Sequence, residues 1–408
     1  MKILLILLIF NSIILNIAIC QKNKPYTELK SIEPDFNDNN DLKSLDSIIG
    51  NRKIIGMGES THGTSEFTTM RHRLFKYLVE NHGYNTFFLE ADFAACQRVN
   101  RYIHGETDSV NLALKEIKLW PWRTEEMKLM IEWMRIYNST HDKKITFVGC
   151  DMQLIEDDFI EIERFFKKSS PINTFQFTTL NSTSQPFEKT KILEEKTRWN
   201  KFTLNFNENT LLSADLINYK MLKMGIDQWF EYNLNPSPSF NYRDSCMALN
   251  IISYLELNPS SKGFYFAHNF HVSKAIHIYS KNKEYAKKVT GRYLLEKYDT
   301  SYFVILQDMN QGSFNAYNYK DKEYNFEVFN LEPSKSNSIS HYYNKFNTPV
   351  LFSTQFTKKK KIQITLIGSV YEKSKFSKKH GRYTEFSVDF FYAFLFIKDT
   401  HQTKVIWD

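Results

Sequence analysis

Four short apolar runs, each ending in polar or titratable residues, constrain the fold of this 408-residue chain most strongly. They cover residues 53–57, 86–89, 144–149 and 262–267. The runs are rich in β-branched or aromatic residues, and turn signals or helical patterns separate them, which is typical of strands that alternate with helices. This alternation predicts an α/β fold with a mostly parallel sheet flanked by helices.

The residues that follow these runs are expected to meet at one place. Right-handed crossovers between neighbouring parallel strands put the carboxyl ends of the strands on one edge of the sheet, and open α/β sheets bind ligands at that edge. Six acidic or histidine side chains occupy these positions, namely Glu59, His62, Glu90, Asp151, His268 and His271. The sequence therefore predicts a polar, titratable cleft.

The densest group of polar residues lies in the turn after the first run. Residues 58–64 read Gly-Glu-Ser-Thr-His-Gly-Thr, and a helical pattern over 64–81 follows. Glu59 and His62 are three residues apart, so the carboxylate can orient the imidazole as a general base. Taken alone, the turn also fits a simpler interpretation, in which Ser60 or Thr61 caps the next helix and His62 is merely solvated.

Three familiar catalytic or binding motifs fail in this turn. A nucleophile elbow needs Gly-x-Ser-x-Gly, but His62 stands where the last glycine should be. A dinucleotide fingerprint needs three spaced glycines, and Thr61 occupies the third place. A zincin needs His-Glu-x-x-His, and Gly58 replaces the first histidine. These near misses favour an acid–base site without a covalent intermediate.

Further motifs follow in order along the chain. They are Phe88-Leu89-Glu90, Trp120-Pro121-Trp122-Arg123, Val148-Gly149-Cys150-Asp151, the stretch 243–250 that begins Arg-Asp-Ser-Cys, and Ala267-His268-Asn269-Phe270-His271. Together with the turn at 58–64, these motifs resemble the erythromycin esterase family in order, spacing and several rare residues. The resemblance spans about residues 40–400. It implies hydrolysis of an ester or macrolactone, with no metal and no cofactor.

The residue chemistry agrees with this resemblance and assigns a base. Neutral His62 would take a proton from water as the water attacks an acyl carbon. Glu59 would hold His62 in the required tautomer and stabilise its cationic form. Arg71, about two turns into the following helix, would stabilise the developing oxyanion or orient a carboxylate.

The remaining candidates have both a catalytic and a structural interpretation. Glu90 would position the water or share a proton with His268, and His271 would protonate the leaving alcohol. Alternatively, Glu59 or Glu90 is a structural partner of Arg71, and His271 lies on a helix face. Substrate-binding candidates are Trp122, Arg123 and Asp151, although Trp122 also fits a core position and Asp151 a helix cap. Arg243 and Asp244 fit a structural pair.

Two other functions remain open at this stage. The same histidines and glutamates suit zinc or manganese, so a metal-dependent hydrolase is one alternative. A non-enzymatic haem- or ligand-binding protein of related fold is the other. The expected partner is a small ester or lactone, and nucleic acid is not expected because no aromatic-basic pattern accompanies the lysine run 358–361. That run is predicted to lie in a hairpin turn between strands near 349–356 and 362–368.

The chain is predicted to divide into several segments. Residues 1–20 resemble a signal peptide, so we expect an exported, periplasmic or secreted protein without stable membrane insertion after its removal; lipid anchoring at Cys20 is the less favoured alternative. The predicted α/β core comprises residues 21–170 and 241–310. A mostly helical insertion at 171–240 is a candidate lid, and residues 311–408 form a smaller α+β portion.

Overall fold

The structure is a computed structural model that describes most of the chain. The described residues are 26–169, 175–177, 180, 187–235, 240–275, 288–320, 323–354, 361–371 and 382–407. The predicted signal peptide at 1–20 lies outside them. Within the described ranges, no helix is both long and apolar enough to cross a membrane.

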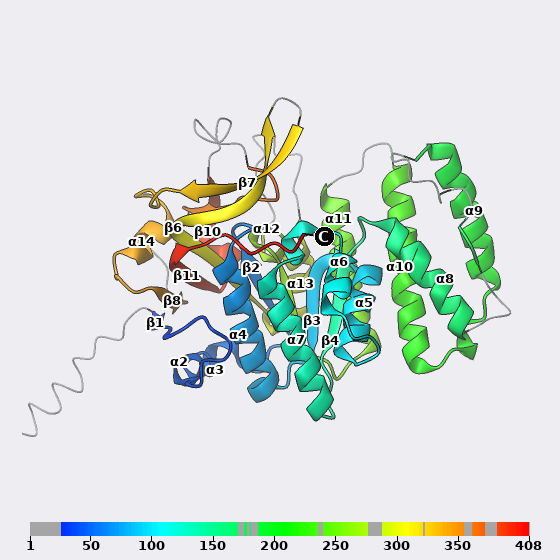
Figure 1. Cartoon of the computed structure of the whole chain (residues 1–408), viewed down its shortest axis with the longest axis horizontal. Helices are drawn as coiled ribbons and strands as arrows, with labels where there is room; N and C mark the ends of the chain where they lie inside the picture. Colours follow the sequence, from blue (N-terminus) through cyan, green and yellow to red (C-terminus); the bar gives the residue numbers. More distant parts are fainter. Residues whose placement is uncertain are drawn as a thin grey trace, which may run out of the picture.

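A mostly parallel sheet forms the centre of the molecule, as the sequence predicts (Figure 1). In the described ranges the sheet has nine strands in the order β1-β8-β11-β6-β2-β5-β3-β4, with β7 paired to β6. Pairing is parallel from β11 through to β4. The four predicted runs are the neighbouring strands β2 (Ile54–Glu59), β5 (Gly263–His268), β3 (Thr86–Asp92) and β4 (Thr146–Asp151).

Three further strands, β1, β7 and β8, join the sheet by antiparallel pairing. Strand β8 pairs antiparallel with β11, β1 pairs antiparallel with β8, and β7 pairs antiparallel with β6. The bounds are β1 (Thr27–Glu28), β6 (Tyr302–Lys320), β7 (Glu323–Leu331), β8 (Val350–Ser353) and β11 (Ala393–Thr400). Thus β8 and β11, which come from the predicted C-terminal portion, belong to the same sheet as the core.

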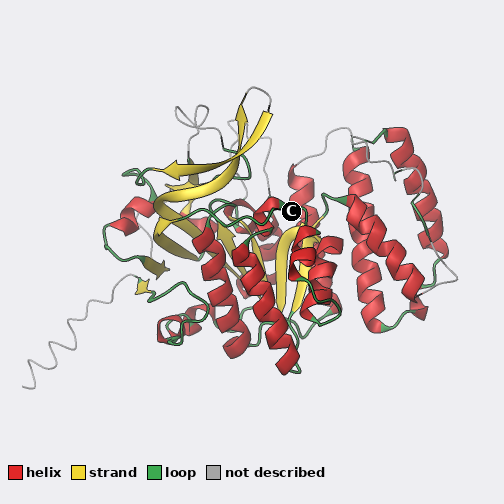
Figure 2. Ribbon diagram, viewed as in Figure 1, coloured by secondary structure: helices red, strands yellow, loops and turns green. Residues whose placement is uncertain are grey.

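Both faces of the sheet are buried, which is the usual state of parallel strands. Consecutive residues of β5 alternate between two hydrophobic clusters: Phe264 and Phe266 belong to one, and Tyr265 and Ala267 to the other. Helices cover both faces (Figure 2). The first cluster packs α4 (Ser65–His82) and α7 (Glu125–Thr140), and the second packs α10 (Ser213–Leu234), α11 (Phe240–Leu257) and α13 (Thr290–Tyr298).

Helices dominate the described residues of the segment 171–240. They include α9 (Lys189–Asn205) and α10. With α8 (Ile155–Ser169) they form a group of helices at one side of the sheet (Figure 1). The further elements are α2 (Asn40–Lys43), α3 (Asp46–Ile49), α5 (Phe93–Ile103), α6 (Val110–Lys115), η1 (Trp120–Trp122), η2 (Glu208–Thr210), α12 (Asn269–Val272), η3 (Asp299–Ser301), α14 (Ile339–Asn344) and η4 (Val388–Phe390).

The predicted hairpin around the lysine run is wrong. Strand β9 (Lys361–Thr365) pairs with β10 (Tyr383–Ser387) in a separate two-stranded sheet, whereas β8 lies in the central sheet. The two strands beside the run therefore pair with distant partners rather than with each other. The division of the chain into core, insertion and C-terminal portion stays a prediction.

Candidate active site

A cavity of about 560 Å³ opens at the carboxyl ends of the central strands. Its polar lining residues include His62, Glu90, Arg243, His268 and His271. Its mainly apolar lining residues include Leu119, Trp120, Trp122, Phe270, Tyr317 and Leu366. Four of the six residues that the sequence placed at this edge therefore border a common cavity, together with an arginine that the sequence analysis did not select.

Glu59 and His62 form a hydrogen-bonded pair at the end of β2. Oε1 of Glu59 lies 2.7 Å from Nδ1 of His62. Because a carboxylate accepts this bond, Nδ1 carries the proton and Nε2 keeps the lone pair of the neutral ring. The Glu59 side chain is fully buried, whereas that of His62 is 13% exposed. This arrangement leaves an imidazole nitrogen that can accept a proton.

Arg71 lies behind this pair rather than at the cavity. Its side chain is completely buried, and Nη2 donates to Oε2 of Glu59 at 3.3 Å and to Oγ1 of Thr68 at 3.1 Å. The guanidinium also stacks on the ring of Phe266. Of the two roles predicted for Arg71, this position fits orientation of a carboxylate, since the side chain does not border the cavity.

Burial shifts the pKa values of both members of this ion pair. It lowers the pKa of Arg71 well below its ordinary value, against the attraction of Glu59. Burial likewise raises the pKa of Glu59, although His62 and Arg71 oppose the rise. The pair is therefore held in a low-dielectric environment, where each charge depends on the other.

Close backbone packing explains the glycines of the turn. A Cβ on Gly58 would collide with Asn269, and a Cβ on Gly63 would collide with the backbone of Asn315. The turn is further fixed because the amide of Ile367 donates to the carbonyl of Ser60 at 2.8 Å. The N-cap of α4 is Thr64, so the simpler interpretation, with Ser60 or Thr61 as the cap, is wrong.

Glu90, in β3, is held as an anion. Its Oε1 accepts from Nη2 of Arg243 at 2.7 Å, and its Oε2 accepts from the backbone amide of His268 at 3.0 Å. Burial opposes the charge, but His271 and Arg243 lower the pKa of Glu90 below its ordinary value. The contact with His268 is thus to its amide, and the imidazole that lies near the carboxylate belongs to His271, at 3.3 Å.

His271 and His268 are biased toward opposite protonation states. Although burial favours neutral His271, Asp244 and Glu90 raise its pKa; Nδ1 of His271 donates to Oδ1 of Asp244 at 2.8 Å. For His268, burial and the neighbouring His62 lower the pKa to about 3, and Nε2 lies 3.1 Å from the carbonyl oxygen of Ile367. Environments that separate pKa values in this way are typical of acid–base sites.

Arg243 and Asp244 are the residues whose roles the sequence analysis missed. They do not pair with each other: Nε of Arg243 donates to both oxygens of Asp151 at 3.0 and 3.1 Å, and Nη2 donates to Glu90. Asp244 instead accepts from His271. The sequence signal was their place in a motif of the resemblance, but neighbouring helix residues point in different directions and reach different partners.

Of the three predicted substrate-binding residues, Trp122 borders the cavity, whereas Asp151 and Arg123 do not. Trp122 borders the cavity; its Nε1 donates to the carbonyl of Glu90 at 2.9 Å, and its ring meets that of His62 edge-on at 5.8 Å. Asp151 is only 1% exposed and is held by Arg243, so it lies behind the cavity wall. Arg123 does not border the cavity.

Two further expectations concern a metal and a lid. In the part of the chain that the structure describes, no three His, Cys, Asp or Glu side chains are arranged to hold a metal ion. The metal-dependent alternative therefore gains no support from these residues.

No residue from α9 or α10 borders the cavity, so the described residues give no support to the predicted lid.

Comparison with known proteins identifies the family. The model of the erythromycin esterase family matches residues 79–400. Erythromycin esterase type II of Escherichia coli is 27% identical over 283 residues, which are 59% of this chain and 65% of that protein. The putative hydrolase YbfO of Bacillus subtilis is 24% identical over 269 residues, 58% of this chain and 60% of that protein. The chain thus covers less than two thirds of either relative.

Solved structures show the same fold. A succinoglycan biosynthesis protein superposes with a TM-score of 0.75 at 23% identity, covering 94% of this chain and 96% of that one. A mutant of the erythromycin esterase EreC in its open conformation gives a TM-score of 0.65 at 16% identity, covering 92% and 97%. Since the family model matches residues 79–400 of 408, the chain belongs to the erythromycin esterase family, and this membership supports a hydrolase.

Proposed function

We propose that the protein hydrolyses a carboxylic ester or macrolactone by general-base activation of water. The observation that carries this proposal is the His62–Glu59 pair. The hydrogen bond from Nδ1 of His62 to Oε1 of Glu59, at 2.7 Å, leaves Nε2 to act as a base. His62 and His271 line the same cavity. The two imidazoles supply a base and an acid within one site.

The proposed reaction begins with an ester whose carbonyl carbon lies near His62. Nε2 of His62 accepts a proton from water while the water oxygen attacks that carbon, and the carbonyl π electrons move to its oxygen. Glu59 stabilises the imidazolium that forms. General-base assistance of this kind contributes on the order of 10²–10⁴-fold in rate.

Collapse of the tetrahedral intermediate releases the acid and the alcohol, after which solvent takes the proton from His62 and returns one to His271. The oxyanion re-forms the carbonyl, the bond to the alkoxy oxygen breaks, and His271 donates its proton to the leaving oxygen. Arg243 borders the cavity and is our candidate for stabilising the oxyanion. This assigns to Arg243 the direct role that Arg71, buried behind Glu59, is not placed to perform.

The cavity favours a substrate with a substantial apolar part. Its volume of about 560 Å³ and its aromatic wall of Trp120, Trp122 and Tyr317 can cover a bulky acyl or alcohol group. The relative from Escherichia coli is named for erythromycin, so macrolactones belong among the first candidates. The predicted N-terminal signal adds the proposal that the reaction takes place outside the cytoplasm.

A substrate screen tests this proposal. The protein is incubated with simple esters, lactones and erythromycin, and mass spectrometry detects the gain of one water, with and without chelator. We expect chelator-insensitive turnover of at least one substrate and its loss in His62→Ala. Turnover that requires added metal, or that survives in His62→Ala, would contradict the proposal. An absorption spectrum of the purified protein tests the haem-binding alternative.

A further inference from the structure

The segment that follows β11 crosses the active-site side of the molecule. We call residues 401–406 the strap. Figure 1 shows this red segment leaving β11 and passing above α4 and α7. Isolated β-bridges join it to the chain at Thr64 and at Thr124. The strap lies beyond residues 79–400, which the family model matches.

One end of the strap is hydrogen-bonded to Gly63, Ser65 and Glu66, which closely follow His62. The carbonyl of His401 accepts from the amide of Ser65 at 2.9 Å, and the amide of Thr403 donates to the carbonyl of Gly63 at 2.9 Å. Glu66 accepts from both the amide and Nδ1 of His401, each at 2.8 Å. Gly63 directly follows His62, so these bonds fix the backbone that carries the proposed base.

The other end of the strap is hydrogen-bonded to Arg123 and Glu125, which follow Trp122 in the chain. The carbonyl of Lys404 accepts from the amide of Glu125 at 2.9 Å, and the amide of Ile406 donates to the carbonyl of Arg123 at 2.7 Å. Arg123 directly follows Trp122, whose ring meets His62 edge-on. The strap therefore joins the two chain segments whose side chains face each other at the cavity.

The buried carboxylate of Glu126 in α7 connects this helix to α4 and to the strap. Glu126, only 9% exposed, accepts from Oγ of Ser65 at 2.6 Å and from the amide of Lys404 at 3.2 and 3.3 Å. On the other side, Nδ2 of Asn315 donates to the carbonyl of Thr403 at 2.7 Å. The strap is thus held by partners from α4, α7 and β6 at once.

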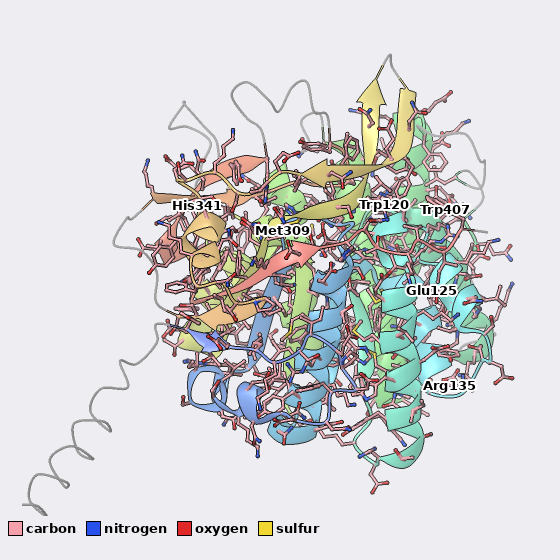
Figure 3. The ribbon with its side chains drawn as sticks, turned by 60° about the vertical axis from the view of Figure 1, so that its left-hand side comes forward. Trp120, Glu125, Arg135, Met309, His341 and Trp407 are labelled. Atoms are coloured by element: carbon pink, nitrogen blue, oxygen red, sulfur yellow. The ribbon has the colours of Figure 1, made fainter. Side chains whose placement is uncertain are left out.

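Aromatic packing anchors the chain just past the strap. Trp407 meets Phe326 of β7 at 4.9 Å between ring centroids, and Phe326 meets Trp120 at the same distance. Figure 3 shows the labelled Trp407, Trp120 and Glu125 on the same side of the molecule, near the base of the β6–β7 hairpin. The strap is therefore fixed at both of its ends.

We propose that the strap is a positioning element of the active site, which holds the backbone of His62 and that of Trp122 at a set separation. This inference rests on the proposed function in so far as His62 is the base. Misplacement of a reacting group by about 1 Å can lower a rate roughly 10²-fold. A strap variant should therefore lower kcat far more than it changes KM.

A matched pair of variants at one position tests the proposal in the full chain. The Lys404 side chain is exposed, and only its amide donates to Glu126. Lys404→Pro removes that donor, whereas Lys404→Ala retains it. Glu126→Ala removes the acceptor instead and serves if the proline variant does not fold. The readouts are kcat, KM and the NMR signals of the His62 imidazole.

We expect Lys404→Pro and Glu126→Ala to lower kcat by about 10-fold to 10²-fold, with little change in KM, and to shift the His62 signals. Lys404→Ala should match wild type in all three. If the signals and kcat of all variants equal those of wild type, the proposal is wrong. If wild type hydrolyses no ester but the His62 signals still move in Lys404→Pro and Glu126→Ala alone, the strap inference holds and only the proposed reaction fails.

Discussion

The ion pair behind His62 gives a prediction that separates stability from activity. Glu59→Gln keeps an oxygen that can accept from His62 but removes the charge that faces Arg71. The Arg71 side chain has no exposed surface, and its Nη2 donates to Glu59 at 3.3 Å. The substitution therefore leaves a buried guanidinium without its counter-ion.

The size of the effect follows from that burial. Removing one partner of a buried ion pair typically destabilises a protein by about 3–5 kcal/mol, because the remaining charge stays uncompensated. Such a loss is a large part of the roughly 5–15 kcal/mol that usually stabilises a folded protein. Burial already lowers the pKa of Arg71, which agrees with a charge that depends on Glu59.

A second substitution should restore stability without restoring activity. Arg71→Met removes the charge and keeps an apolar side chain of similar length beside Phe266. In the double variant Glu59→Gln/Arg71→Met, we expect about 2–3 kcal/mol of the loss to return, because replacing a whole buried pair is often close to neutral. Activity should stay low in both variants, since neither has the carboxylate that stabilises cationic His62.

Urea unfolding followed by tryptophan fluorescence measures the first effect, and ester hydrolysis measures the second. The reasoning would be refuted if Glu59→Gln unfolds within about 1 kcal/mol of wild type, well below the range for a broken buried pair. It would also be refuted if the double variant is no more stable than Glu59→Gln. Recovery of activity in the double variant would contradict the role given to Glu59.

Three further predictions concern neighbouring groups. In Asp244→Asn the pKa of His271 falls, because the carboxylate that helps to raise it is gone. In the proposed mechanism kcat needs protonated His271, so as pH rises kcat should decline at a lower pH than in wild type. A pH–rate profile measures this shift. Gly63→Ala pushes a Cβ into the backbone of Asn315 and should destabilise the fold by about 1–3 kcal/mol, seen as a lower melting temperature. For Glu90, whose pKa is lowered, the stabilisation is full above its ordinary value of 4.5 and is lost as pH falls below it. The stability difference between wild type and Glu90→Gln should therefore shrink on acidification; a constant difference in urea midpoints would contradict this.

The central sheet could be predicted because its signals are local. Each of the runs that became β2, β3, β4 and β5 is short, apolar and bounded by turns, and parallel topology then brings their ends together. The pairing of β8 could not be predicted in this way. Its partner β11 lies about 40 residues further along the chain, and nothing near the lysine run shows that β9 joins another sheet.

Part of the cavity lining could be predicted from the sequence, because strand ends are also a local signal. Glu59, His62, Glu90, His268 and His271 lie at or just after the carboxyl ends of strands, so topology alone brings them near one edge. Helical spacing indicates burial of Arg71, because Phe67 and Leu74 lie four residues before it and three after it, on the buried face of α4. That pattern places Arg71 inside the core rather than at the cavity.

The strap had no local signal. Residues 401–406 carry no apolar periodicity, and most of their contacts use backbone groups that every sequence provides. Arg243 and Asp244 were missed because a helix points adjacent residues in different directions, so their adjacency suggested a pair that the fold does not make. In both cases the partners are set by tertiary structure.

Chemical rescue tests the central claim, that His62 is the base, most directly. His62→Ala should lower kcat by on the order of 10²–10⁴-fold, and added imidazole should restore part of it by taking the proton that the missing side chain no longer accepts. Because the His62 side chain is 13% exposed at the cavity, the vacated space is open to imidazole. Activity of His62→Ala within about threefold of wild type, far below the range for loss of a general base, would contradict the account.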